Sequence, residues 1–172
     1  MFKQKKEKGF TLIELLIVIA IIAIIAAVAF VALDPLTRFR DARDSARWAD
    51  VSALVSAIKV DQVDNKGTYA YGARYDTSNS AVVAGTEYMI STATTTTGCN
   101  ASACSAIAGT ADCVNLYELV TDGYLGALPI SPNGSGSWSS TLTGYYFVYN
   151  SNGSVTVTAC EAENTSSISL TR

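Results

Sequence analysis

The most constraining feature of this sequence is a long apolar run near its N-terminus. Residues 15–33 include no polar side chain, and the run extends back to Phe10 with one acidic interruption, Glu14. As a helix, residues 10–33 would measure about 36 Å, enough to cross a hydrocarbon core of about 30 Å. A carboxylate inside such a span costs a few kcal/mol, so Glu14 is a candidate functional residue.

Two ordinary explanations of this run can be compared with its details. A secretory signal peptide, cut near the small residues 27–29, should have an apolar core of about 7 to 15 residues, and this run is longer. A plain signal anchor fits the length. Neither explanation requires a glycine, an aromatic residue and a glutamate at fixed offsets.

Those offsets define a motif. Four lysines lie within the first eight residues, Gly9 follows them, Phe10 opens the apolar run, and Glu14 is the fifth residue counted from Phe10. The motif resembles the class III leader and mature N-terminus of type IV pilins and of the pseudopilins of type II secretion systems. The resemblance is specific over residues 1–33. It implies cleavage after Gly9 by a prepilin peptidase and N-methylation of Phe10 by the N-methyltransferase.

The spacing of Phe10 and Glu14 has a chemical reason. Cleavage would create an α-amine on Phe10, and residues i and i+4 share one face of a helix. The amine and the carboxylate can neutralise each other, within a subunit or between neighbours, where an unpaired charge would be very costly. The resemblance implies that Glu14 meets the N-terminus of an adjacent subunit and sets the register of assembly.

Charge and composition exclude several function classes. Without residues 1–9 the chain has eight basic and fourteen acidic residues, which argues against nucleic-acid binding by the bulk of the head. The leader lysines favour a cytoplasmic N-terminus and an external remainder. The chain has no histidine and no phosphate-binding glycine loop, so we expect neither an enzyme nor a cofactor nor a metal site.

The expected organisation has four parts. Residues 1–9 are the cleaved leader, 10–33 the membrane-spanning and filament-core half of a helix, 34–66 its amphipathic half, and 67–172 an external globular head. Proline disturbs a helix, so at Asp34 and Pro35 the helix either kinks or stops and restarts, with Asp34 as N-cap and Pro35 in the first helical position. Because long pilin helices often tolerate a proline here, we expect one kinked helix.

Residues 36–65 have a helical apolar period. The expected buried stripe contains Leu36, Phe39, Ala42, Ala46, Ala49, Ala53, Ala57 and Val60, widened by Leu54 and Ile58. The charged residues between them are Arg38, Arg40, Asp41, Arg43, Asp44, Arg47 and Asp50. We expect these charges to form a solvated face with local pairs. The alternative is a contact between filament subunits.

The head contains signals for short elements. A short strand is expected near residues 87–90, an exposed Thr/Ser-rich loop at 92–111, and a short helix at 114–120. Residues 144–149 and 154–159 should form a hairpin around Asn152 and Gly153.

Four cysteines, Cys99, Cys104, Cys113 and Cys160, fall in the expected external part, and an even number there predicts two disulfides. We expect the pairs Cys99–Cys104 and Cys113–Cys160, because the second closes a long loop and resembles the disulfide-bounded C-terminal region of many pilins. That resemblance does not determine the partner. Cys99 or Cys104 would reach Cys160 if the loop folds back.

These observations predict an α+β chain with the type IV pilin fold, in which a long N-terminal helix packs on a small antiparallel sheet. The expected function is a structural subunit of a pilus-like filament. Its partners would be the prepilin peptidase, identical or related subunits and an inner-membrane assembly platform. It would begin as a single-pass protein of the cytoplasmic membrane and end in a surface filament. The alternatives are a pseudopilin of a periplasmic pseudopilus and a membrane-anchored external binding module that does not polymerise.

Overall fold

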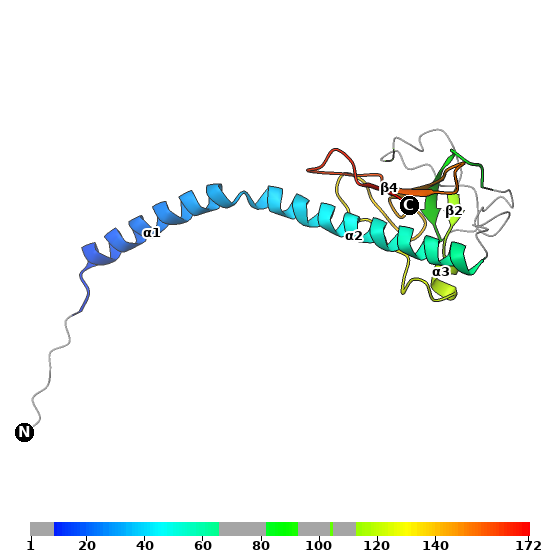
Figure 1. Ribbon diagram of the computed structural model, residues 1–172. Helices are drawn as coiled ribbons and strands as arrows, with labels where there is room; N and C mark the ends of the chain where they lie inside the picture. Colours follow the sequence, from blue (N-terminus) through cyan, green and yellow to red (C-terminus); the bar gives the residue numbers. More distant parts are fainter. Residues whose placement is uncertain (1–8, 66–81, 93–103, 105–112) are drawn as a thin grey trace, which may run out of the picture. The chain divides into compact units, whose positions relative to one another are not determined.

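The computed structural model describes residues 9–65, 82–92, 104 and 113–172. Two helices come first, α1 (Leu12–Leu33) and α2 (Pro35–Asp64) (Figure 1). The elements that follow in the described residues are β1 (Glu87–Ser91), β2 (Cys113–Asn115), α3 (Glu118–Thr121), β3 (Tyr145–Tyr149), β4 (Val155–Ala159) and β5 (Ser169–Thr171). A long apolar helix followed by a mostly antiparallel sheet confirms the α+β class and is consistent with the pilin fold.

The contacts within the chain divide it into two compact units, Met1–Phe39 and Arg40–Arg172. The first unit contains α1 and the first residues of α2. The second contains the rest of α2 and all the strands. Most of α2 therefore belongs to the same compact unit as the sheet.

Helix α1 has no buried residue along its 22 positions. Because apolar side chains cover all sides of α1, the helix has no polar face that could lie against water. A helix that is apolar all round belongs in a membrane or a protein core. At about 33 Å, α1 is long and apolar enough to cross a membrane.

The helical path is broken at one residue, Asp34. Its backbone is left-handed, with φ 36° and ψ 72°, and α2 starts at the next residue, Pro35. A residue before proline is disfavoured in the right-handed helical region, and aspartate tolerates the left-handed one better than most residues. The helix therefore stops and restarts here, with Pro35 in the first helical position as the restart alternative had it. Asp34 is the C-cap of α1.

Helix α2 buries a different face from the expected one. Leu36 is 69% exposed, Phe39 63% and Val60 49%, and Ala57 is the one member of the predicted eight-residue stripe that is buried. The buried face is Asp44, Arg47, Val51, Leu54, Val55, Ala57, Ile58 and Asp61. Leu54 and Ile58, which were expected to widen the stripe, are buried as predicted. The rest of the stripe apart from Ala57 was wrong because it consists mainly of alanines, which bury little area. The sheet instead covers the face with Val51, Leu54, Val55 and Ile58.

The sheet has the order β2-β1-β3-β4-β5. Strands β1 and β2 run parallel, and the other neighbours are antiparallel. The hairpin of β3 and β4 confirms the prediction around Asn152 and Gly153, where Gly153 adopts a φ of 84°. The parallel β1–β2 pair is the departure from an all-antiparallel sheet.

The two faces of the sheet bury different clusters. The face toward α2 packs residues such as Tyr88, Tyr145, Phe147 and Val157 against the helix. The other face buries Met89, Cys104, Cys113 and Trp138, with Leu142, Tyr146 and Cys160 at the edge of the cluster. This alternation follows from the period of two along a strand.

One expectation for a short element needs correction, one strand was not expected, and one expectation lies outside the described residues. The expected helix at 114–120 is a strand in its first part, because Val114 pairs with Ile90 and is fully buried, and the helix α3 keeps four residues. Strand β5 was not expected. The Thr/Ser-rich loop at 92–111 lies outside the described residues apart from Thr92 and Cys104.

Candidate processing and assembly site

Gly9 and Phe10 lie just before the first turn of α1. Neither residue is in a helix or strand, and the side chain of Phe10 is 87% exposed. A Cβ added at Gly9 would have no heavy atom within 4 Å. The fold of this chain therefore does not itself require a glycine at position 9.

Glu14 forms a capping box with Thr11, the N-cap of α1. The Thr11 backbone N–H donates to Glu14 Oε2 at 2.8 Å and the Thr11 hydroxyl donates to the same oxygen at 2.9 Å. The Glu14 N–H donates to Thr11 Oγ1 at 3.3 Å. Sequence reasoning missed this contact, although a threonine followed three residues later by a glutamate is its known pattern.

The capping box leaves part of the Glu14 carboxylate available. Both donors from Thr11 bind Oε2, and an ionised carboxylate has about four acceptor positions on its two oxygens. Glu14 can therefore hold the helix start of its own chain and accept another donor at Oε1. An α-amine created at Phe10 is a donor of the required charge.

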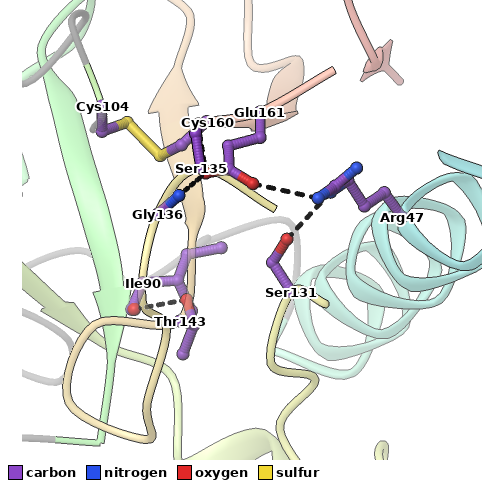
Figure 2. The surroundings of a disulfide bond; sticks show 9 residues. All are labelled: Arg47, Ile90, Cys104, Ser131, Ser135, Gly136, Thr143, Cys160 and Glu161. Atoms are coloured by element: carbon purple, nitrogen blue, oxygen red, sulfur yellow. Dashed lines mark hydrogen bonds and ion pairs between the residues drawn. A yellow bond between two sulfur atoms is a disulfide. The ribbon is translucent and has the colours of Figure 1, made fainter. Parts of the chain in front are cut away.

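The disulfide at the head joins Cys104 to Cys160, with a Cα–Cα distance of 4.8 Å (Figure 2). The expected pairing of Cys113 with Cys160, and with it Cys99–Cys104, is therefore wrong, and the fold-back alternative for Cys104 describes the structure. Cys113 is itself disulfide-bonded, while Cys99 lies outside the described residues. Strand β2 places Cys113 beside β1, whereas Cys160 directly follows β4 on the same face of the sheet.

A buried ion cluster ties α2 to the segment after Cys160. Arg47 has no exposed surface, and each of its five N–H donors has a hydrogen bond. The acceptors are Asp44 Oδ1 (2.8 Å), Glu163 Oε1 (3.0 Å), Ser131 Oγ (3.1 Å), the Pro132 carbonyl (2.9 Å) and Glu161 Oε2 (3.0 Å). Figure 2 shows Arg47 reaching from α2 to Ser131 and Glu161.

Asp44 and Arg43 extend this cluster on the helix side. Asp44 accepts the backbone N–H groups of Glu163, Asn164 and Thr165. Burial alone would raise the pKa of Asp44, but these N–H groups and Arg47 lower it overall. The two-pronged hydrogen bond from Arg43 lowers the pKa of Glu163 to about 2, against the opposing effect of burial.

Glu161 connects the cluster to the disulfide, because it directly follows Cys160. Its Oε1 accepts the Gly136 N–H and the Ser135 hydroxyl, the latter at 2.9 Å. A Cβ at Gly136 would lie 2.6 Å from that same oxygen and from Trp138 Cζ2, so glycine is required there. The Glu161 carboxylate thus joins the turn at Gly136 to Arg47, next in the chain to the disulfide at Cys160.

The expectation of a solvated charged face is wrong for Asp44 and Arg47, which are 3% and 0% exposed. The local pair between them exists at i,i+3, but most of their partners lie more than eighty residues away. No local sequence pattern predicts hydrogen-bond partners that lie so far away in the chain. Arg38, Arg40 and Asp41 are exposed, as expected.

Comparisons with known proteins address the N-terminal segment. No curated protein and no solved structure matches the chain. Residues 4–30 match the family model for the prokaryotic N-terminal methylation motif, a stretch that includes Gly9, Phe10 and Glu14. Residues 4–30 therefore carry the class III signal that is found in type IV pilins and pseudopilins.

Proposed function

We propose that this chain is a structural subunit of a type IV pilus-like filament, cleaved between Gly9 and Phe10, N-methylated on Phe10, and polymerised through its N-terminal helix. The observation that carries the proposal is a helix apolar on all sides and exposed along its whole length, with one carboxylate at the fifth residue after the cleavage point. A lipid bilayer covers such a helix before assembly. Neighbouring copies of α1 cover it afterwards.

The exposed stripe of α2 supports the same conclusion. Leu36, Phe39 and Val60 are exposed, and alanines at positions 42, 46, 49 and 53 lie between them. Small side chains let helices approach closely, so this stripe suits contact with helices of neighbouring subunits. A membrane-anchored module that never polymerises has no use for this second apolar surface.

Glu14 is proposed to pair with the Phe10 amine of a neighbouring subunit through Oε1, while Oε2 holds Thr11. A matched pair of substitutions separates these two roles. Glu14→Gln keeps a capping residue that works in this box but loses the charge. Thr11→Ala breaks the box and keeps the carboxylate.

Filament content of the producing strain, counted by electron microscopy and by quantifying sheared surface protein, is the measurement. We expect Glu14→Gln to lower filament content at least tenfold and Thr11→Ala to leave it within about twofold, with both variants inserted in the membrane. Normal filament content in Glu14→Gln would refute the pairing. Mass spectrometry of the native N-terminus tests processing, and a mature chain that retains Met1 would refute it.

The choice between a pilus and a secretion pseudopilus needs a separate experiment. Deleting the gene and assaying twitching, DNA uptake and protein secretion distinguishes the two, because the pseudopilin alternative predicts a defect in secretion alone. Membrane anchoring without any filament would support the binding-module alternative.

A further inference from the structure

The break at Asp34 creates a groove on the first unit of the chain. The groove has a volume of about 430 Å³ and is lined by Phe30, Val31, Asp34, Pro35 and Leu36. Its lining is mainly apolar, and Asp34 supplies one carboxylate. The Thr37 hydroxyl holds that carboxylate at the break through a hydrogen bond to Oδ2 of 2.5 Å.

The depth of this groove follows from the length of α1. Because α1 measures about 33 Å and a hydrocarbon core about 30 Å, Asp34 falls at the external boundary of the core. The headgroup layer adds about 5 to 7 Å on each side, and Arg38 lies about 6 Å farther along the helix. Both charged residues therefore belong to the headgroup layer.

Arg38 supplies the opposite charge one turn from Asp34. Its N–H donates to the Asp34 carbonyl at 3.3 Å, which places it in the next turn. Its side chain is exposed and has no hydrogen bond or ion pair within the described part of the chain. Side chains on a helix lean toward the N-terminus, so the guanidinium of Arg38 reaches back toward the depth of Asp34.

We propose that this groove binds a glycerophospholipid whose headgroup ends in a primary ammonium, in the outer leaflet of the cytoplasmic membrane. The ammonium donates to Asp34, the phosphate accepts from Arg38, and an acyl chain lies along Phe30, Val31 and Leu36. A quaternary ammonium has no N–H to donate, and an anionic headgroup is repelled by Asp34. The proposal rests on the proposed function in one respect, the membrane position of α1.

The test uses the full chain, first in vesicles and then in detergent. Flotation with vesicles establishes insertion. The delipidated chain is then titrated with phosphatidylethanolamine, phosphatidylcholine or phosphatidylglycerol, and bound lipid is counted by native mass spectrometry. The variants are Asp34→Asn and Arg38→Gln. Arg172→Gln is the matched control, because it removes an exposed arginine at the far end of the chain.

We expect phosphatidylethanolamine to bind about fivefold more tightly than phosphatidylcholine, the effect of an interfacial ion pair worth about 1 kcal/mol. Asp34→Asn should abolish this preference. Arg38→Gln should weaken both lipids about fivefold and keep their ratio, and Arg172→Gln should change neither. Equal binding of the two lipids by an inserted wild-type chain, or a preference for phosphatidylglycerol, overturns the proposal.

Failure of the proposed function gives a different result. A chain that does not float with vesicles has no membrane-spanning α1. A chain that inserts and prefers the ammonium headgroup but forms no filaments refutes polymerisation alone.

Discussion

At the scale of single residues, Arg47 differs from every other charge of α2. Five acceptors surround its guanidinium, three of them carboxylates, and it has no contact with solvent. Burying a charge is costly, and a cluster of this kind repays the cost only when every donor and acceptor is satisfied. Removal of one member leaves the others buried without compensation.

Arg47→Met should therefore lower the free energy of unfolding by about 3 to 5 kcal/mol, because Asp44 and Glu161 would stay buried without their cation. Urea denaturation of the detergent-solubilised chain, followed by tryptophan fluorescence, measures the change. The control is Arg38→Met, which removes an exposed arginine of the same helix and should cost less than about 0.5 kcal/mol. A loss below 1 kcal/mol for Arg47→Met would contradict the role of the cluster.

Glu163 gives the cluster a dependence on pH. Its pKa in the folded chain is about 2, below the ordinary value of 4.5, and this depressed pKa means that folding favours the ionised form. The stability from Glu163 is present above about pH 5 and is lost as the pH falls toward 2. Glu163→Gln should be less stable than wild type at pH 7, and the difference should shrink toward pH 2. Parallel stability curves for the two proteins between pH 7 and 2 would contradict this.

At the scale of elements, the junction of α1 and α2 is decided by one proline. Pro35 pushes Asp34 out of the right-handed region, and Asp34 accepts a left-handed backbone that costs about 1 to 2 kcal/mol. The break divides an apolar helix from an amphipathic one and opens the groove at residues 30–36. Local sterics and not packing set this feature, since Asp34 is exposed.

Pro35→Ala should remove the break, because alanine restores a backbone donor and permits a right-handed residue before it. Amide hydrogen exchange at residues 34–36, measured by NMR in micelles, should slow at least tenfold. Thr37→Ala is the control, since it removes the hydrogen bond to Asp34 and keeps the proline. Fast exchange that persists in Pro35→Ala would show that another force holds the break.

At the scale of the whole molecule, the second unit is closed by long-range links. The Cys104–Cys160 disulfide spans 56 positions, and the cluster around Arg47 joins positions that are 84 or more apart. Both links meet at residues 160 and 161. The C-terminal segment is thereby fastened to β4, to the turn at Gly136 and to α2.

Replacing Cys104 and Cys160 together with serine should destabilise the second unit by about 4 kcal/mol, because the unfolded chain regains the entropy that the closed loop removes. We expect the earliest loss of protection at the amides of Gly136, Glu163 and Asn164, because these groups donate to Glu161 and Asp44. Hydrogen exchange with mass spectrometry measures both effects. Unchanged protection at these amides would contradict this prediction and show that the ion cluster holds without the disulfide.

The sequence by itself determined the main features of the N-terminal segment, up to Pro35. Neighbouring residues are enough to predict the apolar helix, the interruption at Asp34 and the motif around Gly9, Phe10 and Glu14. The reason is that helix periodicity, proline sterics and capping act over one or two turns. The hairpin at Gly153 is local in the same sense. The capping box of Thr11 was equally readable, although it was missed.

The tertiary structure alone decided which face of α2 is buried, which cysteine joins Cys160 and where Arg47 finds its partners. Helix α2 has an alanine-rich stripe and a mixed one, and only the sheet's side chains select between them. Residues Cys113–Asn115 form the strand β2 because they pair with β1, where Val114 lies opposite Ile90. Burial and ion pairing act between residues distant in the chain, so their energies depend on the fold and cannot be read from neighbouring residues.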